Sequence, residues 1–122
     1  MPHLVIEYSV PLNPPNAQRL CRATAESLRA HVKANGSPEY PPSGTFVRAY
    51  RAEATQHAED RNDAHFVHAI LKIGPGRDDP TKERTGKALL QALQAFFEQG
   101  TAASVPTISV ELLEFPQTLW RA

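Results

Sequence analysis

The sequence predicts an α/β (α+β) fold in which two βαβ units in tandem form a four-stranded sheet with two helices on one face. The order strand, helix, strand occurs twice within the 122 residues, and "PHLVI" at position 2 can be set over "AHFVH" at position 64, an offset of 62 residues. This repetition indicates an internal duplication of one supersecondary unit. We therefore expect a single domain over residues 1–122, with pseudo-repeats at about 2–60 and 64–115.

The first half begins with a strand expected over residues 3–10, "HLVIEYSV", which is rich in β-forming residues. The breaker "PLNPPN" follows, in which Asn13 or Asn16 can cap a helix that we expect to stop at Gly36. The apolar residues of this helix recur at helical spacing and are Ala17, Leu20, Cys21, Leu28 and Val32. A second strand is expected over residues 45–51, "TFVRAYR".

The second half repeats this order. A strand is expected over residues 64–73, and after the loop "GPGRDD" a helix is expected with Asp79 as its N-cap and Gly100 at its end. The apolar face of this helix consists of Leu89, Leu90, Leu93, Phe96 and Phe97. A last strand is expected over residues 107–115. Strands joined through a helix are normally parallel with a right-handed crossover, so both helices are expected on one face.

Composition restricts the partners of the chain. The formal net charge is zero, so we expect neither nucleic acid nor a membrane surface as a partner. No apolar run is long enough to span a membrane and no signal peptide precedes the first strand, so a cytoplasmic location is expected. The single cysteine, Cys21, is expected to be a small core residue and not a reactive thiol. Strands such as "HFVHAIL" are too apolar to face water, so another copy of the chain is expected to cover them.

Pro2 is the first candidate for chemistry, because removal of Met1 would leave it with a free secondary amine. An α-amino group has a pKa of about 7.7–8.0, which apolar surroundings or nearby cations lower. Leu4, Ile6 and Tyr8 alternate along the following strand, so an apolar setting is expected. Such an amine suits the role of a general base. The alternative is a proline that only starts a strand, where proline is tolerated.

Three basic residues are candidates for binding an anionic substrate. Arg77 lies in the loop "GPGR" before a helix, where free backbone N–H groups and the helix dipole favour an anion. Arg48 lies in mid-strand between two apolar residues, an unusual place for a charge unless it faces a site or an interface. Lys72 precedes the loop and is a third candidate. Arg51 is three residues beyond Arg48 and therefore points to the opposite face of a regular strand.

The five histidines do not indicate a metal site. His65 and His68 are three residues apart on an expected strand, so their side chains point to opposite faces and cannot chelate one ion together. His3 and His65 coincide in the repeat, which indicates a shared packing role. Glu7 lies near the strand start and can either orient a neighbour or remain a solvated carboxylate.

The start "MPH" before an apolar strand, the stretch "FVHAILKIGPGR" and the trace at Pro116, Thr118 and Leu119 resemble the 5-carboxymethyl-2-hydroxymuconate isomerases of the tautomerase superfamily. The resemblance covers nearly the whole chain, and its most specific part is "FVHxxLKIGxGR". It implies a homotrimer without a cofactor, in which an N-terminal proline, here Pro2, is the general base. The implied reaction moves a C=C double bond in an unsaturated di- or tricarboxylate formed during the breakdown of aromatic acids.

One position departs from this resemblance. The family strand carries two arginines spaced by two, whereas this chain has Phe46 before Arg48, which puts the number of substrate carboxylates in doubt. Two other kinds of protein stay open: a promiscuous enol–keto tautomerase of small 2-keto acids, which needs fewer arginines, and a trimeric binding protein in which Met1 keeps the Pro2 nitrogen an amide. Hydration or dehalogenation of acids needs a second group to activate water, and the sequence offers no clear candidate.

Overall fold

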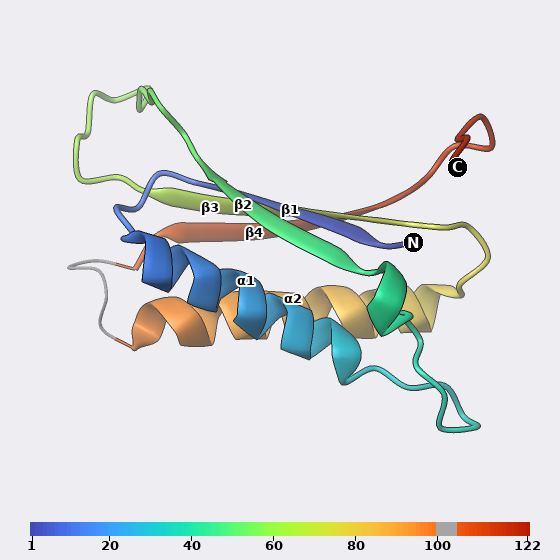
Figure 1. Cartoon of the computed structure of the whole chain (residues 1–122). Coiled ribbons are helices and arrows are strands. Elements are labelled where there is room, and N and C mark those ends of the chain that lie inside the picture. The colour runs from blue at the N-terminus through green and yellow to red at the C-terminus, as the bar shows by residue number, and fades with distance from the viewer. Residues whose placement is uncertain (100–104) are drawn as a thin grey trace.

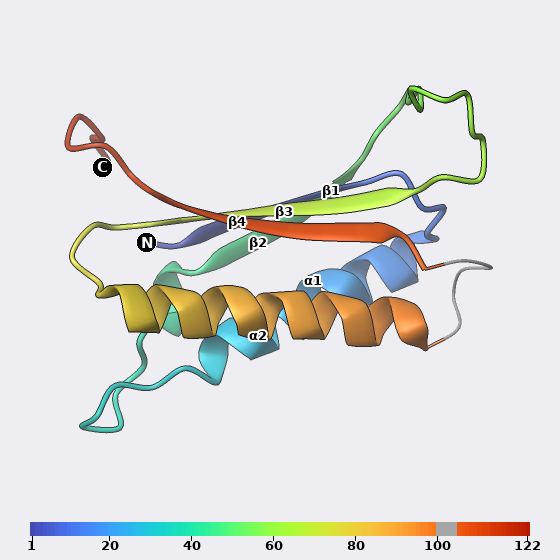
Figure 2. The same ribbon diagram turned by 180° about the vertical axis from the view of Figure 1, so that it is seen from behind.

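The chain is described by a computed structural model over residues 1–99 and 105–122. Both helices cover one face of a four-stranded sheet (Figure 1), and the view from behind shows the same two layers (Figure 2). The elements follow the order β1 (His3–Tyr8), α1 (Pro14–Arg29), the 3-10 helix η1 (Pro42–Gly44), β2 (Phe46–Arg51), β3 (Phe66–Ile73), α2 (Asp79–Glu98) and β4 (Thr107–Glu114). The predicted fold class is confirmed.

The strands lie in the order β2-β1-β3-β4. Within each unit the two strands are parallel, as expected for a helical crossover, whereas β1 and β3 pair antiparallel in the centre of the sheet. As a result β1 and β2 begin at the same end of the sheet at which β3 and β4 finish. We call this end the proline end, because Pro2 directly precedes β1.

The core lies between the sheet and the helices. Alternate residues of β1 and β3 point toward the helices and are fully buried, as is typical of strands with one covered face. The helices complete this core with one apolar stripe each, and burial of one large apolar side chain stabilises the fold by about 1.5–3 kcal/mol. The buried apolar residues are Leu4, Ile6, Tyr8, Val10, Leu20, Leu28, Tyr40, Val67, Ala69, Leu71, Ile73, Leu89, Leu93 and Phe97.

Helix α1 ends earlier than predicted, at Arg29 and not at Gly36. Val32 lies beyond the helix, is 59% exposed and forms an isolated antiparallel bridge with Pro38. Gly36, at φ 85°, closes the turn of this small hairpin by donating its N–H to the Lys33 carbonyl. The assignment of Val32 to the apolar helix face was therefore wrong, because a glycine turn signal was taken for a helix end.

The two helix starts follow the same chemistry. Asn13 caps α1, and its side chain accepts a backbone N–H of the first turn. The N-cap of α2 is Asp78 and not Asp79: its carboxylate accepts the Thr81 N–H at 2.9 Å, and Asp79 is already helical. The helix end predicted at Gly100 lies outside the residues that the structure describes.

The strand register corrects the alignment of the two halves. His3 pairs with Phe46 and Phe66 pairs with Thr107, so His3 corresponds to Phe66 and the offset is 63 residues. Burial agrees, because Leu4 and its counterpart Val67 are both buried, whereas the predicted offset of 62 would have set Leu4 on the opposite face. His3 and His65 are therefore not equivalent. The boundaries of the pseudo-repeats stay a prediction.

None of the helices in residues 1–99 and 105–122 covers the other face of the sheet, which we call the bare face. It is mixed in character: Phe46, Tyr50 and Leu113 are 49%, 57% and 41% exposed, and charged side chains such as Arg48 lie between them. The segment between β2 and β3 and the tail after β4 both rise on this side of the sheet (Figure 1). Neither helix in the described part of the chain has the length and apolar character needed to cross a membrane.

Candidate active site

Pro2 lies buried at the proline end, immediately before β1. Its carbonyl accepts the Phe46 N–H at 3.0 Å, which ties the start of β1 to the start of β2. Met1 packs beside Gly44, where an added Cβ would lie 3.7 Å from the Met1 side chain. While Met1 is attached, the Pro2 nitrogen is an amide and has no basic lone pair. Pro2 is therefore held at the start of β1, beside the start of β2.

The electrostatic setting at this end disfavours a protonated amine. Burial lowers the pKa of the Met1 amino group, and the charges of Arg121 and then Arg77 lower it further. Sequence reasoning missed Arg121, which lies in the tail after β4. The antiparallel pairing of β1 with β3 brings the end of β4 to the start of β1, and the sequence had predicted pairing only within each unit.

The tail after β4 is bound to the proline end through Phe115, its first residue. Phe115 donates its N–H to the Ile73 carbonyl at 2.8 Å, and its ring meets that of His3 edge-on with centroids 6.0 Å apart. Leu119 then donates to the Pro116 carbonyl at 3.3 Å, which forms a turn before Arg121. Arg121 comes to the proline end because β1 pairs with β3 and β3 pairs with β4, and not because of a local sequence motif.

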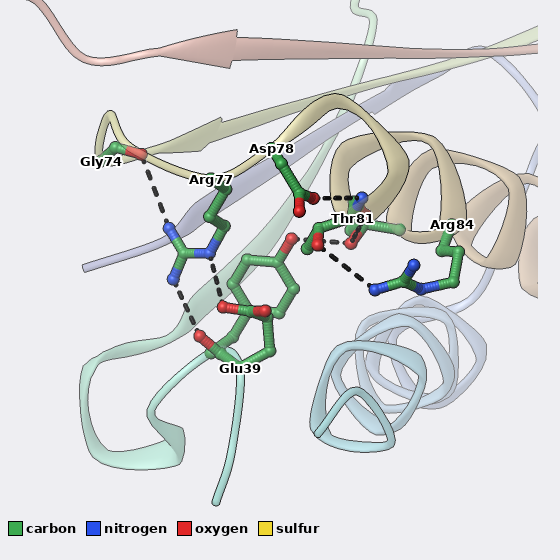
Figure 3. A network of polar contacts seen from close by, with 8 residues as sticks. Glu39, Gly74, Arg77, Asp78, Thr81 and Arg84 are labelled. Carbon is green, nitrogen blue, oxygen red and sulfur yellow. Dashed lines mark hydrogen bonds and ion pairs between the residues drawn. The ribbon is translucent and has the colours of Figure 1, made fainter. Parts of the chain in front are cut away.

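Arg77 is held by the segment that connects α1 to β2. Its Nε donates to Glu39 Oε2 at 3.1 Å, its Nη2 donates to the Glu39 carbonyl at 2.8 Å, and its Nη1 lies 3.5 Å from the Gly74 carbonyl (Figure 3). Both charged side chains are largely buried, at 20% and 15% exposure. Sequence reasoning missed Glu39, because its pairing with Arg77 depends on how the two halves pack together.

A buried tyrosine forms the platform under Arg77. The guanidinium carbon lies 4.5 Å from the centroid of the Tyr40 ring, a cation–π distance. The Tyr40 hydroxyl is 2.6 Å from Thr85 Oγ1, and Thr85 in turn donates to the Thr81 carbonyl at 2.9 Å. Burial raises the pKa of Tyr40, so this hydroxyl stays neutral. Arg77 is thus fixed to the first turns of α2 through Tyr40.

The helix start beside Arg77 is already occupied by the chain's own acid. The prediction invoked free backbone N–H groups for a bound anion, but the Asp78 carboxylate accepts the Thr81 N–H there. The Thr81 side chain and then this backbone N–H lower the pKa of Asp78, which favours the ionised carboxylate. The Thr81 N–H is therefore not free to bind an anion at this helix start.

Arg48 lies on the bare face, two residues beyond Phe46. Its Nη1 donates to Nδ1 of His3 at 3.1 Å, and the His3 ring stacks on Phe46 with centroids 5.4 Å apart. Burial, then Arg48, then the amino terminus lower the pKa of His3, so the imidazole is neutral and its Nδ1 is an acceptor. Phe46 thus packs on His3, the residue that follows Pro2.

The remaining basic candidates divide between the two faces. Lys72 is exposed and pairs with His3 across β1 and β3, so it lies near Arg48 on the bare face. Arg51 pairs with Tyr8 at the far end of β2, on the side of the buried residues, as its spacing from Arg48 had indicated. Arg48, Lys72, Arg77 and Arg121 therefore all lie at or near the proline end, whereas Arg51 does not.

The histidines expected not to form a metal site lie apart. His65 Nδ1 is 3.2 Å from Ser9 Oγ, and His68 Nδ1 contacts Ser109 Oγ. Within residues 1–99 and 105–122, no group of three or more histidine, cysteine or acidic side chains is arranged to hold a metal ion. Glu7 is exposed on the bare face, opposite Tyr50 and His68. Cys21 is partly buried, and burial raises the pKa of its thiol, as suits a packing residue.

Known proteins resemble this chain over nearly its full length. The family of 5-carboxymethyl-2-hydroxymuconate isomerases matches residues 2–121. The 5-carboxymethyl-2-hydroxymuconate Delta-isomerase of Escherichia coli is 26% identical over 123 residues, which cover 98% of this chain and 90% of that protein. The crystal structure of a 5-carboxymethyl-2-hydroxymuconate isomerase from Deinococcus radiodurans R1 has a TM-score of 0.82 at 31% identity, covering 99% of this chain and 88% of the other.

A more distant structure shares the fold alone. A fused 4-OT, described as a symmetric trimer, has a TM-score of 0.68 at 18% identity, covering 95% of this chain and 87% of that one. Its assembly is a property of that protein. The likeness shows that the same arrangement of strands and helices occurs in that protein as well.

Proposed function

The chain belongs to the 5-carboxymethyl-2-hydroxymuconate isomerase family, and on this premise we propose that it is a cofactor-independent isomerase with the free amine of Pro2 as its general base. The family supports an isomerase function in general. The finer proposal is that the enzyme transposes a C=C bond in an unsaturated keto or hydroxy di- or tricarboxylate, in the manner of an intramolecular oxidoreductase.

The proposed reaction is a proton transfer within one substrate. The neutral Pro2 amine removes a proton from carbon in a keto substrate, or from the enol oxygen in a hydroxy substrate, which gives a dienolate, and the same amine returns the proton to another carbon of that dienolate. Arg48, Arg77 and Lys72 are proposed to bind the substrate's carboxylate or enolate oxygens. A fixed cation beside a developing anion lowers the barrier to its formation. Atoms balance without water or a metal ion.

One observation carries this proposal: burial, Arg121 and Arg77 all lower the pKa of the Met1 amino group, and the amine that removal of Met1 would free on Pro2 lies one residue away. A lowered pKa increases the unprotonated fraction of a base near neutral pH, and the unprotonated form is the one that can accept a proton from the substrate. The pairing of Arg48 with neutral His3 brings a third cation to the same end.

Assembly is part of the proposal. The bare face exposes Phe46, Tyr50 and Leu113, and apolar side chains of this size favour contact with another protein surface. The occupant that we propose is two further copies, as a homotrimer, which would also wall the otherwise open proline end. The expected mass in solution is about three times the chain mass of 13.5 kDa.

A second candidate is a tautomerase acting on small 2-keto acids. Phe46 favours it, because an aromatic ring stands where a second arginine would bind another carboxylate. The third possibility is a binding protein without activity, which would follow if Met1 were retained on Pro2.

A substrate comparison tests these alternatives. Protein whose mass shows that Met1 has been removed is assayed by ultraviolet absorbance with 5-carboxymethyl-2-hydroxymuconate and with phenylpyruvate. We expect a higher kcat/KM with the muconate. Preference for phenylpyruvate would favour the second candidate, and turnover of neither compound by processed protein would contradict the proposed function.

A further inference from the structure

Arg77, which is expected to bind substrate at the loop before α2, is already paired with a carboxylate of the chain itself, that of Glu39. Arg77 donates to the Glu39 carboxylate at 3.1 Å through Nε, and the pair is largely withdrawn from water at 20% and 15% exposure. Screening by solvent is weak for such a pair, so Glu39 offsets much of the positive charge that an approaching carboxylate would meet. A carboxylate ligand of Arg77 therefore competes with Glu39.

Two contacts hold the Arg77 guanidinium in position while a ligand carboxylate competes with the Glu39 carboxylate for it. The Glu39 carbonyl accepts Nη2 at 2.8 Å, and the Tyr40 ring lies under the guanidinium carbon at 4.5 Å. Neither contact involves the Glu39 carboxylate, so both persist if that carboxylate loses its charge. Three of the five N–H groups of Arg77 are used by Glu39 and Gly74, and a carboxylate that binds through Nε has to replace the Glu39 carboxylate there.

The segment that carries Glu39 is itself ordered by backbone contacts. Glu39 donates its N–H to the His31 carbonyl at 3.0 Å, and Lys33 donates to the Ser37 carbonyl at 2.8 Å. This places the Glu39 carboxylate beside Arg77 without help from any ligand. Arg77 and Glu39 line a surface depression together with Lys33 and Gly76, so a small anion can reach the pair from solvent.

We infer that Glu39 is a specificity-determining residue that occupies Arg77 as an internal carboxylate and is displaced, wholly or in part, when a substrate carboxylate binds. This inference rests on the proposed function for its substrate, but the competition concerns any small carboxylate. Glu39 acts through Arg77 and contacts no reacting atom, so it is not a catalytic residue. It weakens the hold of the site on single carboxylates and favours substrates that are also bound elsewhere, as at Arg48.

The test uses Glu39→Gln, which keeps an oxygen acceptor for Nε and removes the charge, with adipate as an unreactive dicarboxylate. We expect adipate to bind about three- to tenfold more tightly to this variant by calorimetry, as for loss of a competing ion pair. The KM for the muconate should fall by a similar factor while kcat changes little. Glu83→Gln removes one carboxylate from an exposed helical pair with Lys87 and is the control, expected to leave both constants unchanged.

A second measurement is made on the unaltered protein and so does not depend on the folding of Glu39→Gln. In the unaltered protein, saturation with adipate should shift the ¹⁵N–¹H resonance of Arg77 Nε, assigned by its loss in Arg77→Lys, because its acceptor changes. An unmoved resonance, or adipate binding to Glu39→Gln that is equal or weaker, overturns the inference. Tighter adipate binding in protein that isomerises nothing would leave the inference standing and reject the proposed function. Isomerisation by the unaltered protein, with equal adipate affinity in Glu39→Gln, would reject the inference about Glu39 and leave the proposed function standing.

Discussion

At the proline end β1 and β2 begin, and at the opposite end of the sheet β3 and β4 begin in the same way. The backbone contacts correspond: the Pro2 carbonyl accepts from Phe46 at 3.0 Å, and the His65 carbonyl accepts from Thr107 at 2.9 Å. Likewise Phe115 donates to Ile73 and Ala52 donates to Tyr8, both at 2.8 Å. The duplicated unit thus provides two similar sheet ends.

The chemistry of the two ends differs. At the opposite end the counterpart of Pro2 is His65, which lies in mid-chain and contacts Ser9 at 3.2 Å, and Arg61 nearby is paired with Asp63. At the proline end an amino group lies under the influence of Arg77 and Arg121. The comparison teaches that the fold positions both ends equally, and that the chain terminus and unequal placement of arginine make only one of them a candidate for catalysis.

The largest effect is expected from blocking the amine. Protein that keeps Met1, prepared by inhibiting methionine aminopeptidase during expression, should lose about 10²- to 10⁴-fold in kcat/KM, because an amide nitrogen is not a base. Mass spectrometry of the N-terminus accompanies each assay. Changing the counterpart, His65→Ala, should leave kcat/KM close to that of the unaltered protein. Equal activity with and without Met1 would remove the distinction between the two ends.

The next effect concerns the arginines. Arg77→Ala should lower kcat/KM by about ten- to a hundredfold, as expected when a charge-assisted hydrogen bond to substrate is lost. Arg61→Ala, which removes the same side chain from the opposite end, is the control and should have no effect on turnover. Steady-state kinetics on both variants, with circular dichroism to verify the fold, provide the measurement. Equal rates for the two variants would return Arg77 to a structural role.

A smaller effect on stability is expected from the platform under Arg77. Tyr40→Phe removes the hydroxyl that lies 2.6 Å from Thr85 in a buried setting and should destabilise the fold by about 0.5–1.5 kcal/mol. Thermal unfolding should show a Tm lower by a few degrees. Tyr50→Phe, at an exposed position, should leave the Tm unchanged. A Tm unaffected by Tyr40→Phe would mean that this bond does not stabilise the proline end.

The smallest effect concerns the tail. Burial and then Arg121 lower the pKa of the Met1 amine, one residue from Pro2, so Arg121→Ala should raise the pKa of the freed Pro2 amine and move the acidic limb of the kcat/KM profile to higher pH. Below that limb activity should fall by about two- to fivefold, the range expected for exposed charges, and above it activity should not change. High salt should reduce the difference between the two proteins. A shift to lower pH would contradict the sign of this effect.

The sequence predicted features that depend on neighbouring residues and missed those that depend on residues far apart in the chain. The strands and helices, the single covered face and the candidate Pro2 follow from local patterns, and the family from "FVHAILKIGPGR". The antiparallel join of β1 to β3 carries no local signal, and for that reason Arg121 at the proline end was missed. Glu39 was missed for a similar reason, because its partner Arg77 belongs to the other half. The predicted offset of 62 residues between the two halves was wrong by one residue. Offsets of 62 and 63 both set apolar residues over apolar residues, and the strand register and burial distinguish them.

The central claim is that Pro2 carries a free amine with a lowered pKa. Protein labelled with ¹⁵N-proline tests it directly, because of the 11 prolines only one with a free amine titrates in ¹⁵N spectra. We expect one titrating resonance, with a midpoint below that of the same amine in an unstructured peptide that begins Pro-His-Leu-Val. The acidic limb of kcat/KM should follow the same midpoint. A midpoint equal to or above that of the peptide, or activity in protein with no titrating proline, would contradict the account.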